Sequence, residues 1–300
     1  MFEQYEQQRQ KAIKDLIENA QAVSDDQGKM STIQKLPGIV TTKVDGQTVL
    51  LPGYIPFIGK KYFHPHTKGR RILAYALSQN LRPNAEHTLK WAENWVKSDG
   101  LIALNRQNVS FESSGRSPLA MMHPFDTGHI PILCGLLRHL LKLGGRGSQS
   151  FFSIYDEIAA TNLSKFSFRT ASGRRTTDRL DSLRYCWEWF SLSELSILKP
   201  DYILCAGEAV YKVVREGLPT KSNIFPIKVA FPSLQVINRW YRKPGKPDTS
   251  YLLSEFSEED LNRRVKQRKA LREVIERDWY YFEQMYESMR EQLREHGRKT

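Results

Sequence analysis

Apolar and polar runs alternate along the chain in a pattern typical of strands separated by helices. Four runs of strand length are followed by segments of helical spacing, with strands at 72–77, 157–162, 201–206 and 227–231 and helices at 130–143, 177–198 and 207–216. Such alternation is typical of a parallel sheet that helices cover on both faces. The pattern therefore predicts an α/β fold built on a central four-stranded parallel sheet flanked by helices.

The N-terminal part adds a helix and a hairpin to this core. Apolar side chains recur at helical spacing over residues 2–20, which predicts an amphipathic helix. In residues 39–51, Asp45-Gly46 separates two β-rich runs, and this dipeptide is a strong signal for a two-residue hairpin turn. We assign residues 1–60 to an N-terminal helix and β-hairpin extension.

The C-terminal part is predicted to be helical. A Ser-Glu-Glu-Asp capping pattern starts at Ser257, and apolar residues follow at helical spacing to about residue 296, as one long helix or two. An apolar helical stripe packs against the core or against a second subunit, so an oligomer through this helix is one alternative. DNA contact by its arginine face is another. The expected divisions are then 61–245 for the α/β domain and 246–300 for a C-terminal helical extension.

Composition and charge narrow the class of partner. The formal charge of +12 at pH 7 indicates a polyanionic partner, of which nucleic acid is the commonest. No apolar run approaches the roughly 18 to 20 residues that span a bilayer, and the N-terminus lacks the apolar core of a signal peptide. We therefore expect a cytoplasmic protein with no membrane association.

Candidate metal ligands are too scattered to predict a metal site. The cysteines are widely separated in apolar segments, which argues against a disulfide framework or a four-cysteine cluster and favours core positions for Cys134, Cys186 and Cys205. The histidines lack a compact triad with a carboxylate, and we interpret them as loop or core residues: His64, His66, His123 and His129. The sequence predicts no metal and no cofactor.

The residues after each predicted strand carry the candidate chemistry, because open parallel sheets bind ligands beyond the carboxyl ends of their strands. Asparagines and small residues occupy these positions, in Ser78-Gln79-Asn80-Leu81, Asn162-Leu163-Ser164-Lys165, Gly207-Glu208 and Pro232-Ser233-Leu234. No serine-histidine-acid trio, glycine-rich nucleotide loop or pair of close carboxylates stands out among them. The alternative for either asparagine is a turn capped by its own side chain.

Segments around these strand ends resemble the uracil-DNA glycosylase superfamily, and especially its iron-sulfur branch. The similar segments are HPFDTGHIPILCGLLRHLLKLGG (123–145), ATNLSKFSFRTASGRR (160–175) and LSILKPDYILCAGEAVYKVV (195–214). With the first and last predicted strands, the resemblance spans residues 70–240. It implies the fold and DNA substrate of that superfamily. The cluster cysteines of the iron-sulfur branch are absent, so no cluster is implied.

The resemblance implies roles only at matching positions. Asn80 matches the residue that positions the hydrolytic water. Gln79, which precedes it, is expected to bind the base. Phe125 matches the ring that stacks on the extruded base, and Asn162 matches the amide that binds the hydrogen-bonding edge of that base. Ser233 would hold a phosphate and Leu234 would fill the gap in the duplex. Basic side chains near Asn162 are expected to contact DNA as well: Lys165, Arg174 and Arg175.

Departures from the family pattern shape the expected substrate. Phe231 replaces a histidine that donates a hydrogen bond to the leaving base, and Arg82 replaces a tyrosine that excludes 5-substituted pyrimidines. The connection from Asn80 to Phe125 is longer than expected for the family, and long connections are usually functional or irregular. We expect a monofunctional DNA glycosylase that excises a bulky modified cytosine, such as the hydroxymethylated or glucosylated cytosine of phage DNA, and leaves an abasic site.

Two alternatives to this function remain open. One is a uracil-DNA repair glycosylase. The other is a catalytically weak DNA-binding module on the same fold, because the loss of one hydrogen-bond donor such as the histidine replaced by Phe231 lowers a rate by about 100-fold or more. A nucleotide hydrolase is a weaker third option, since no phosphate loop or acidic metal-binding set is visible.

Overall fold

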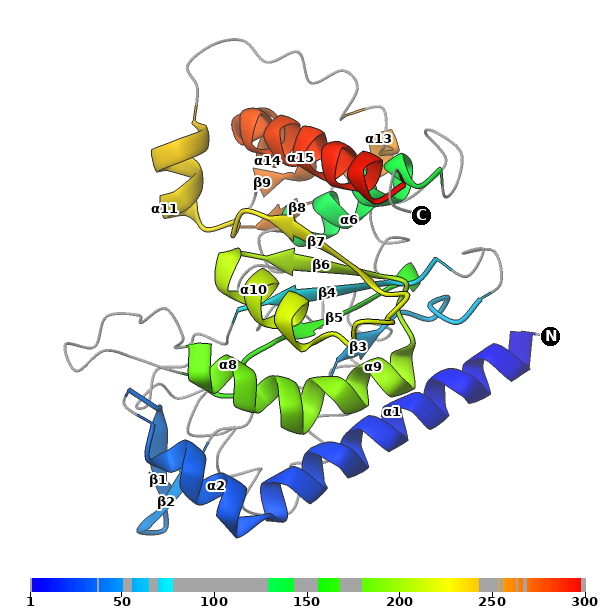
Figure 1. Ribbon diagram of the computed structural model, residues 1–300. Coiled ribbons are helices and arrows are strands. Elements are labelled where there is room, and N and C mark those ends of the chain that lie inside the picture. Colours follow the sequence, from blue (N-terminus) through cyan, green and yellow to red (C-terminus); the bar gives the residue numbers. More distant parts are fainter. Residues whose placement is uncertain are drawn as a thin grey trace.

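The protein is built on a five-stranded mixed sheet with the strand order β3-β5-β4-β6-β7 (Figure 1). The computed structural model describes residues 2–36, 38–50, 56–64, 70–77, 129–142, 156–167, 180–242, 253, 256–262, 264–266 and 269–297. The strands of the central sheet are β3 (Phe57–Ile58), β4 (Ile72–Ala76), β5 (Ile158–Asn162), β6 (Tyr202–Ala206) and β7 (Phe225–Val229). Four strands are parallel, and β3 is antiparallel to β5.

The four parallel strands coincide with the four predicted ones, but the predicted number of strands is wrong. The fifth strand, β3, pairs with β5 through Phe57 opposite Ala160 and Ile58 opposite Ala159. A two-residue strand is too short to show alternation in the sequence, so pattern analysis cannot detect it. Both of its side chains are buried, and β3 covers the outer edge of β5.

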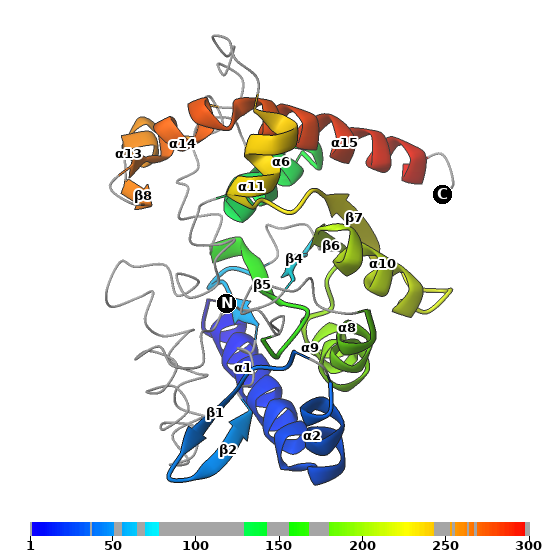
Figure 2. The same ribbon diagram turned by 90° about the vertical axis from the view of Figure 1, so that its left-hand side faces the viewer.

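Helices cover both faces of this sheet (Figures 1 and 2). On one face, α6 (His129–Leu140) packs on β4, and α15 (Trp279–Gly297) packs on α6 and β7. On the other face, α10 (Glu208–Gly217) packs on β6 and β7, beside a continuous stretch formed by α8 (Leu180–Cys186), the π-helical η4 (Trp187–Ser191) and α9 (Leu192–Leu198). Because β4 and β5 are covered on both sides, every one of their residues is buried.

Contacts at the helix ends fix the direction of the two helices on the first face. Near the end of α6, Arg138 pairs with Glu157 just before β5, with 2.6 Å between Nη2 and Oε2. The first residue of α6, His129, therefore lies at the opposite edge, where the parallel strands end. Tyr281, in the first turn of α15, donates from its hydroxyl to the carbonyl oxygen of Ala230 just past β7, at 2.7 Å. Both helices thus begin at the carboxyl edge of the sheet.

The order of connections creates a switch point at this carboxyl edge. The connection after β4 contains α6 on one face, and the connection after β6 contains α10 on the other, while β4 and β6 are neighbours. Adjacent strands whose connections leave in opposite directions open a crevice beyond their carboxyl ends, and α/β sheets bind ligands there. Figure 2 views the molecule toward this edge.

The N-terminal helix and hairpin are confirmed. The elements are α1 (Phe2–Asp25), α2 (Gln27–Gln34), β1 (Thr41–Val44) and β2 (Gln47–Leu50). Asp45 and Gly46 both have positive φ, 50° and 80°, as a two-residue hairpin turn of the I′ type requires. α1 packs on α9 and η4, and Arg9 donates from Nε to the carbonyl oxygen of Ile58 at 2.9 Å. Residues 57–58, which were assigned to the N-terminal extension, form β3 and therefore belong to the central sheet.

The C-terminal segment forms more than one helix, as one of the two alternatives had it. After α11 (Leu234–Val236) and the π-helical η5 (Ile237–Tyr241) come α13 (Glu258–Asn262), the short strands β8 (Arg264–Lys266) and β9 (Lys269–Ala270), and α14 (Leu271–Arg277), which Asp278 separates from α15. Gln292 of α15 accepts the Lys228 amide (2.8 Å) and donates to the Lys228 carbonyl (2.9 Å). α15 therefore packs on the core, while an oligomer contact through it stays a prediction.

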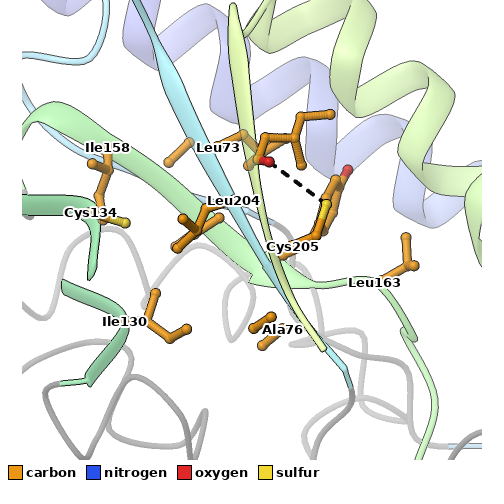
Figure 3. Close-up of a cluster of buried hydrophobic side chains, with 14 of the residues drawn as sticks. Leu73, Ala76, Ile130, Cys134, Ile158, Leu163, Leu204 and Cys205 are labelled. Atoms are coloured by element: carbon orange, nitrogen blue, oxygen red, sulfur yellow. Dashed lines mark hydrogen bonds between the residues drawn. The ribbon is translucent and has the colours of Figure 1, made fainter. Parts of the chain in front are cut away.

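The hydrophobic core lies between the sheet and both helix layers, and Figure 3 shows a part of it. Cys134, Cys186 and Cys205 are all buried, which confirms their predicted core positions. Burial raises the pKa of the Cys134 thiol to about 12, so it stays protonated. Within the described ranges, no cluster of three or more metal-ligating side chains occurs. None of the helices described has the length and apolar character to cross a membrane.

Candidate functional site at the carboxyl edge of the sheet

The predicted site residues divide into those that the structure describes and those that it does not. Outside the described residues lie Gln79, Asn80, Phe125, Arg174 and Arg175, and their roles stay predictions. The others lie at or just beyond the carboxyl edge: Asn162 ends β5, Lys165 follows three residues later, Ser233 follows β7, and Leu234 is the first residue of α11.

Asn162 has a buried side-chain amide that makes no hydrogen bond. The residue is 2% exposed, and neither Nδ2 nor Oδ1 has a partner within the part of the chain described. Its backbone lies opposite Ala76 at the end of β4. A buried donor or acceptor without a partner costs about 1–3 kcal/mol. Two such atoms on one side chain, at the edge where α/β sheets bind ligands, make Asn162 a candidate binding residue.

Lys165 lies on the other side of the same strand end and is itself buried. Its Nζ is 2.6 Å from Glu194 Oε1, and it donates to Thr161 Oγ1 at 3.0 Å and to the Asn162 carbonyl oxygen at 2.9 Å. The residue is 2% exposed, and these oxygens occupy all three donors of the ammonium. The prediction that Lys165 contacts DNA is therefore wrong, because the charge is enclosed and already neutralised.

Glu194 and Tyr75 complete this buried network on the α9 face. The Tyr75 hydroxyl donates to Glu194 Oε2 at 2.7 Å, so each carboxylate oxygen has a donor. Burial, and then the negative charge of Glu194, raise the pKa of Tyr75 well above its usual value, which keeps the hydroxyl in its donating form. The network holds the end of β5 through the Asn162 carbonyl and thereby fixes the backbone that carries the unpartnered amide.

Successive strand residues point to opposite faces, and this alternation separates the two groups. Thr161 points to the α9 face, where it accepts from Lys165. Asn162, the next residue, therefore points to the face that α6 covers. Figure 3 shows Ile130 of α6 and Ala76 of β4 within one cluster of buried side chains. The amide thus lies on the face of the sheet on which α6 packs, at the carboxyl edge.

The end of β7 forms a second part of this edge. Gly207, which follows β6, has a φ of 109°, and a Cβ placed there would lie 3.5 Å from the Cβ of Phe231. Phe231 is half-buried beside this turn and supplies no titratable group at the position of the family's histidine. The Ser233 hydroxyl accepts the Val236 amide at 3.2 Å and so caps α11. The phosphate contact by Ser233 and the wedge role of Leu234 stay predictions.

A buried histidine–aspartate pair at the same edge was missed by sequence analysis. His129 Nε2 lies 2.8 Å from Asp278 Oδ2, although 149 positions separate the two residues, and the imidazole stacks on Phe282 with 5.5 Å between ring centroids. Arg277 donates from Nε to Asp278 Oδ1 at 2.8 Å. Burial alone would raise the pKa of Asp278, but the hydrogen bonds from Arg277 and His129 outweigh it and leave that pKa below its usual value. The pair ties the starts of α6 and α15 together.

Comparison with known proteins adds no family to this description. No protein-family model matches the chain, and no curated protein matches it. Fold and site together describe a mixed α/β protein with a buried, unpartnered amide beyond the carboxyl ends of its parallel strands.

Proposed function

We propose that the protein is a monofunctional DNA glycosylase that extrudes a pyrimidine nucleotide and hydrolyses its N-glycosidic bond, leaving an abasic site. One observation carries the proposal, namely the buried and unpartnered amide of Asn162 at the carboxyl end of β5. The resemblance of the strand-end segments to the uracil-DNA glycosylase superfamily and the charge of +12 support it.

The amide of Asn162 suits the recognition of a pyrimidine edge. It offers one acceptor and two donors, which match either N3 and N4 of cytosine or N3 and O4 of uracil, depending on its orientation. Extrusion of a base from the duplex costs a few kcal/mol. Hydrogen bonds to Asn162 would return part of that cost, because they satisfy two atoms that are otherwise buried without partners.

Hydrolysis needs a water and a stabilised leaving base. The C1′–N bond breaks with its electron pair going to the base, a water oxygen bonds to C1′, and the proton lost by the water balances the charge gained by the base. Asn80 would orient the water, and Phe125 would stack on the base. A neutral amide orients water but accepts its proton poorly, so Asn80 gives slower chemistry than a carboxylate would.

The proposed substrate is a bulky modified cytosine, such as the hydroxymethylated or glucosylated cytosine of phage DNA. Three sequence features support it: Arg82 stands where the family's uracil-selective members have a tyrosine gate, Phe231 replaces the histidine, and the connection between Asn80 and Phe125 is long. A cytoplasmic role in defence against phage follows from such a substrate, and repair follows if the substrate is uracil.

The test is base release from matched duplexes that differ in one base, which is uracil, cytosine, hydroxymethylcytosine or glucosylated hydroxymethylcytosine, followed by detection of abasic sites. We expect release from the modified cytosines. Release of uracil alone would make the protein a repair glycosylase. In the Asn162→Asp variant the carboxylate only accepts, so it keeps the contact to the cytosine amino group or to uracil N3–H and loses the contact to cytosine N3 or uracil O4, and base release should fall for either base. Leu192→Ala, on the exposed surface of α9, is the control.

A catalytically weak DNA-binding module is the second candidate, and Phe231 is the observation that favours it. The side chain is half-buried beside Gly207 and cannot donate a hydrogen bond to a leaving base. Asn80→Ala separates the two candidates. The enzyme loses base release and keeps DNA binding, whereas a binding module shows no base release before or after the substitution.

A further inference from the structure

An exposed tryptophan and two arginines lie on η5 and at the residue that follows it. Trp240 is 66% exposed, although tryptophan is highly buried on average in proteins. Arg239 and Arg242 are also exposed, and the Arg239 guanidinium lies 5.0 Å from the centre of the Trp240 ring. Among the described residues, no ion pair engages either arginine. We call Arg239, Trp240 and Arg242 the η5 surface.

The η5 surface is held at the carboxyl edge of the sheet by packing on its inner side. Ile237 is buried, and its amide donates to the Ser233 carbonyl oxygen at 2.9 Å. Tyr241 packs edge-on against Tyr281, with 5.4 Å between ring centroids, and the Tyr281 hydroxyl donates to Ala230 just past β7. Figure 2 shows α11, which leads into η5, in front of α15 and α6 in the view toward this edge. The segment that carries Trp240 is therefore held in place by the packing of its inner side chains.

The backbone of η5 is π-helical, like that of η4, and π-helical turns occur frequently at functional sites. The side chains of η5 divide between two sides: Ile237 is buried and Tyr241 packs on Tyr281, whereas Asn238, Arg239 and Trp240 are exposed.

We propose that the η5 surface binds DNA, with an unpaired base stacked on Trp240 and neighbouring phosphates on Arg239 and Arg242. An exposed aromatic ring beside unneutralised cations is the combination that binds single-stranded nucleic acid, because every base has a face that can stack and every nucleotide a charge. The base that is left unpaired on the opposite strand, when its partner is extruded, is the one proposed to stack on Trp240. The inference takes from the proposed function only that DNA occupies the carboxyl edge.

The test measures the affinity of the full chain for an unmodified, fluorescein-labelled single-stranded oligonucleotide by anisotropy. Trp240→Ala weakens binding by about 10- to 100-fold, the range expected when stacking on one base is lost. Trp240→Phe, which keeps a stacking face, stays within about 3-fold of the wild type. Leu192→Ala is the matched control, because Leu192 is 42% exposed on a different element. Thermal melts establish that all three variants are folded.

The arginines are tested through the salt dependence of the same binding. Arg239→Gln with Arg242→Gln lowers the slope of log affinity against log salt by about 1.4, since each phosphate contact to a single strand contributes about 0.7. Lys212→Gln with Arg215→Gln removes two exposed charges from α10 and leaves the slope unchanged. Equal loss of slope in both double variants would mean a general charge effect and would contradict a localised site.

Two results would overturn the inference. One is equal DNA affinity of Trp240→Ala and Trp240→Phe. The other is loss of binding to phosphatidylserine vesicles by Trp240→Ala with DNA affinity retained, which would make η5 a membrane contact. Because this readout involves no base release, it fails independently of the proposed function: an inactive wild type with a Trp240 effect refutes the glycosylase alone, and normal base release without a Trp240 effect refutes the η5 surface alone.

Discussion

The two sides of the β5 end differ in how completely their polar groups are satisfied. On the α9 side, Lys165, Glu194 and Tyr75 form a closed network in which the ammonium, both carboxylate oxygens and the hydroxyl are all paired. On the α6 side, the Asn162 amide is equally buried and has no partner within the described residues. A satisfied network stabilises the fold, whereas an unsatisfied amide costs stability and needs another reason to be present. We infer that the polar groups on the first side support the fold, and we propose that the amide on the second side recognises a base.

Replacement of Asn162 by leucine is expected to have the largest effect on base release. We expect base release to fall by roughly 1,000-fold, because a site that recognises by hydrogen bonds discriminates strongly once they are lost. Stability should rise by about 1 kcal/mol, since an apolar group of similar size removes two unsatisfied buried atoms. Base release assays and urea unfolding measure the two effects. Asn262→Leu on the exposed end of α13 is the control, and a destabilised Asn162→Leu variant would instead assign Asn162 a structural role.

Removal of Glu194 should have the next largest effect. Glu194→Ala leaves the Lys165 ammonium buried without its counter-charge, and breaking such a pair typically costs about 3 kcal/mol or more of unfolding free energy. Urea denaturation measures this loss. The exposed Glu188, on the same helical stretch, provides a control through Glu188→Ala.

A double variant sharpens the interpretation of the network. Lys165→Met with Glu194→Leu should recover most of the stability lost in Glu194→Ala, because apolar residues can replace a buried ion pair. Base release by this variant should nevertheless be lower than that of the wild type if Lys165 positions Asn162 through the Asn162 carbonyl oxygen. Full activity in the double variant would show that the network contributes only to stability.

Removal of the Tyr75 hydroxyl tests the hydrogen bond between Tyr75 and Glu194 in the same network. Tyr75→Phe leaves Glu194 Oε2 without its donor, and we expect a loss of about 2 kcal/mol in unfolding free energy, as for other hydrogen bonds to charged groups. Chemical denaturation gives the value, with the half-buried Tyr211→Phe as the matched control. A change of less than a few tenths of a kcal/mol in the unfolding free energy would contradict a stabilising role of this hydrogen bond.

The smallest effect is expected from Asp278, at the other end of the carboxyl edge. Its folded-state pKa lies below the unfolded value, so the carboxylate contributes stability above about pH 4 that is lost as the pH falls through the folded pKa. Asp278→Asn should cost about 1 kcal/mol at neutral pH and less at low pH. Unfolding measured at about pH 7 and about pH 3 tests this, because a pH-independent cost would contradict the assigned charge. Asp181→Asn, on the surface of α8, is the control.

The elements that depend on local pattern can be located from the amino-acid sequence alone. Alternating apolar runs located the four parallel strands, helical spacing located α6, α10 and the C-terminal helices, and Asp45-Gly46 located the hairpin turn, because each signal lies within a few residues of the element it specifies. The rule that ligands bind beyond strand carboxyl ends also selected Asn162 from the sequence.

The surroundings of each of these residues depend on how the chain folds and are seen only in the three-dimensional structure. Lys165 looks like a surface cation in the sequence, and only the packing of α9 on the sheet encloses it with Glu194. The pairing of His129 with Asp278 and the edge strand β3 likewise depend on segments far apart in the chain. Burial and hydrogen bonding are properties of neighbours in space. They therefore separate a lysine whose charge is paired from a nearby amide without a partner among the described residues, although the sequence places both in the same short segment.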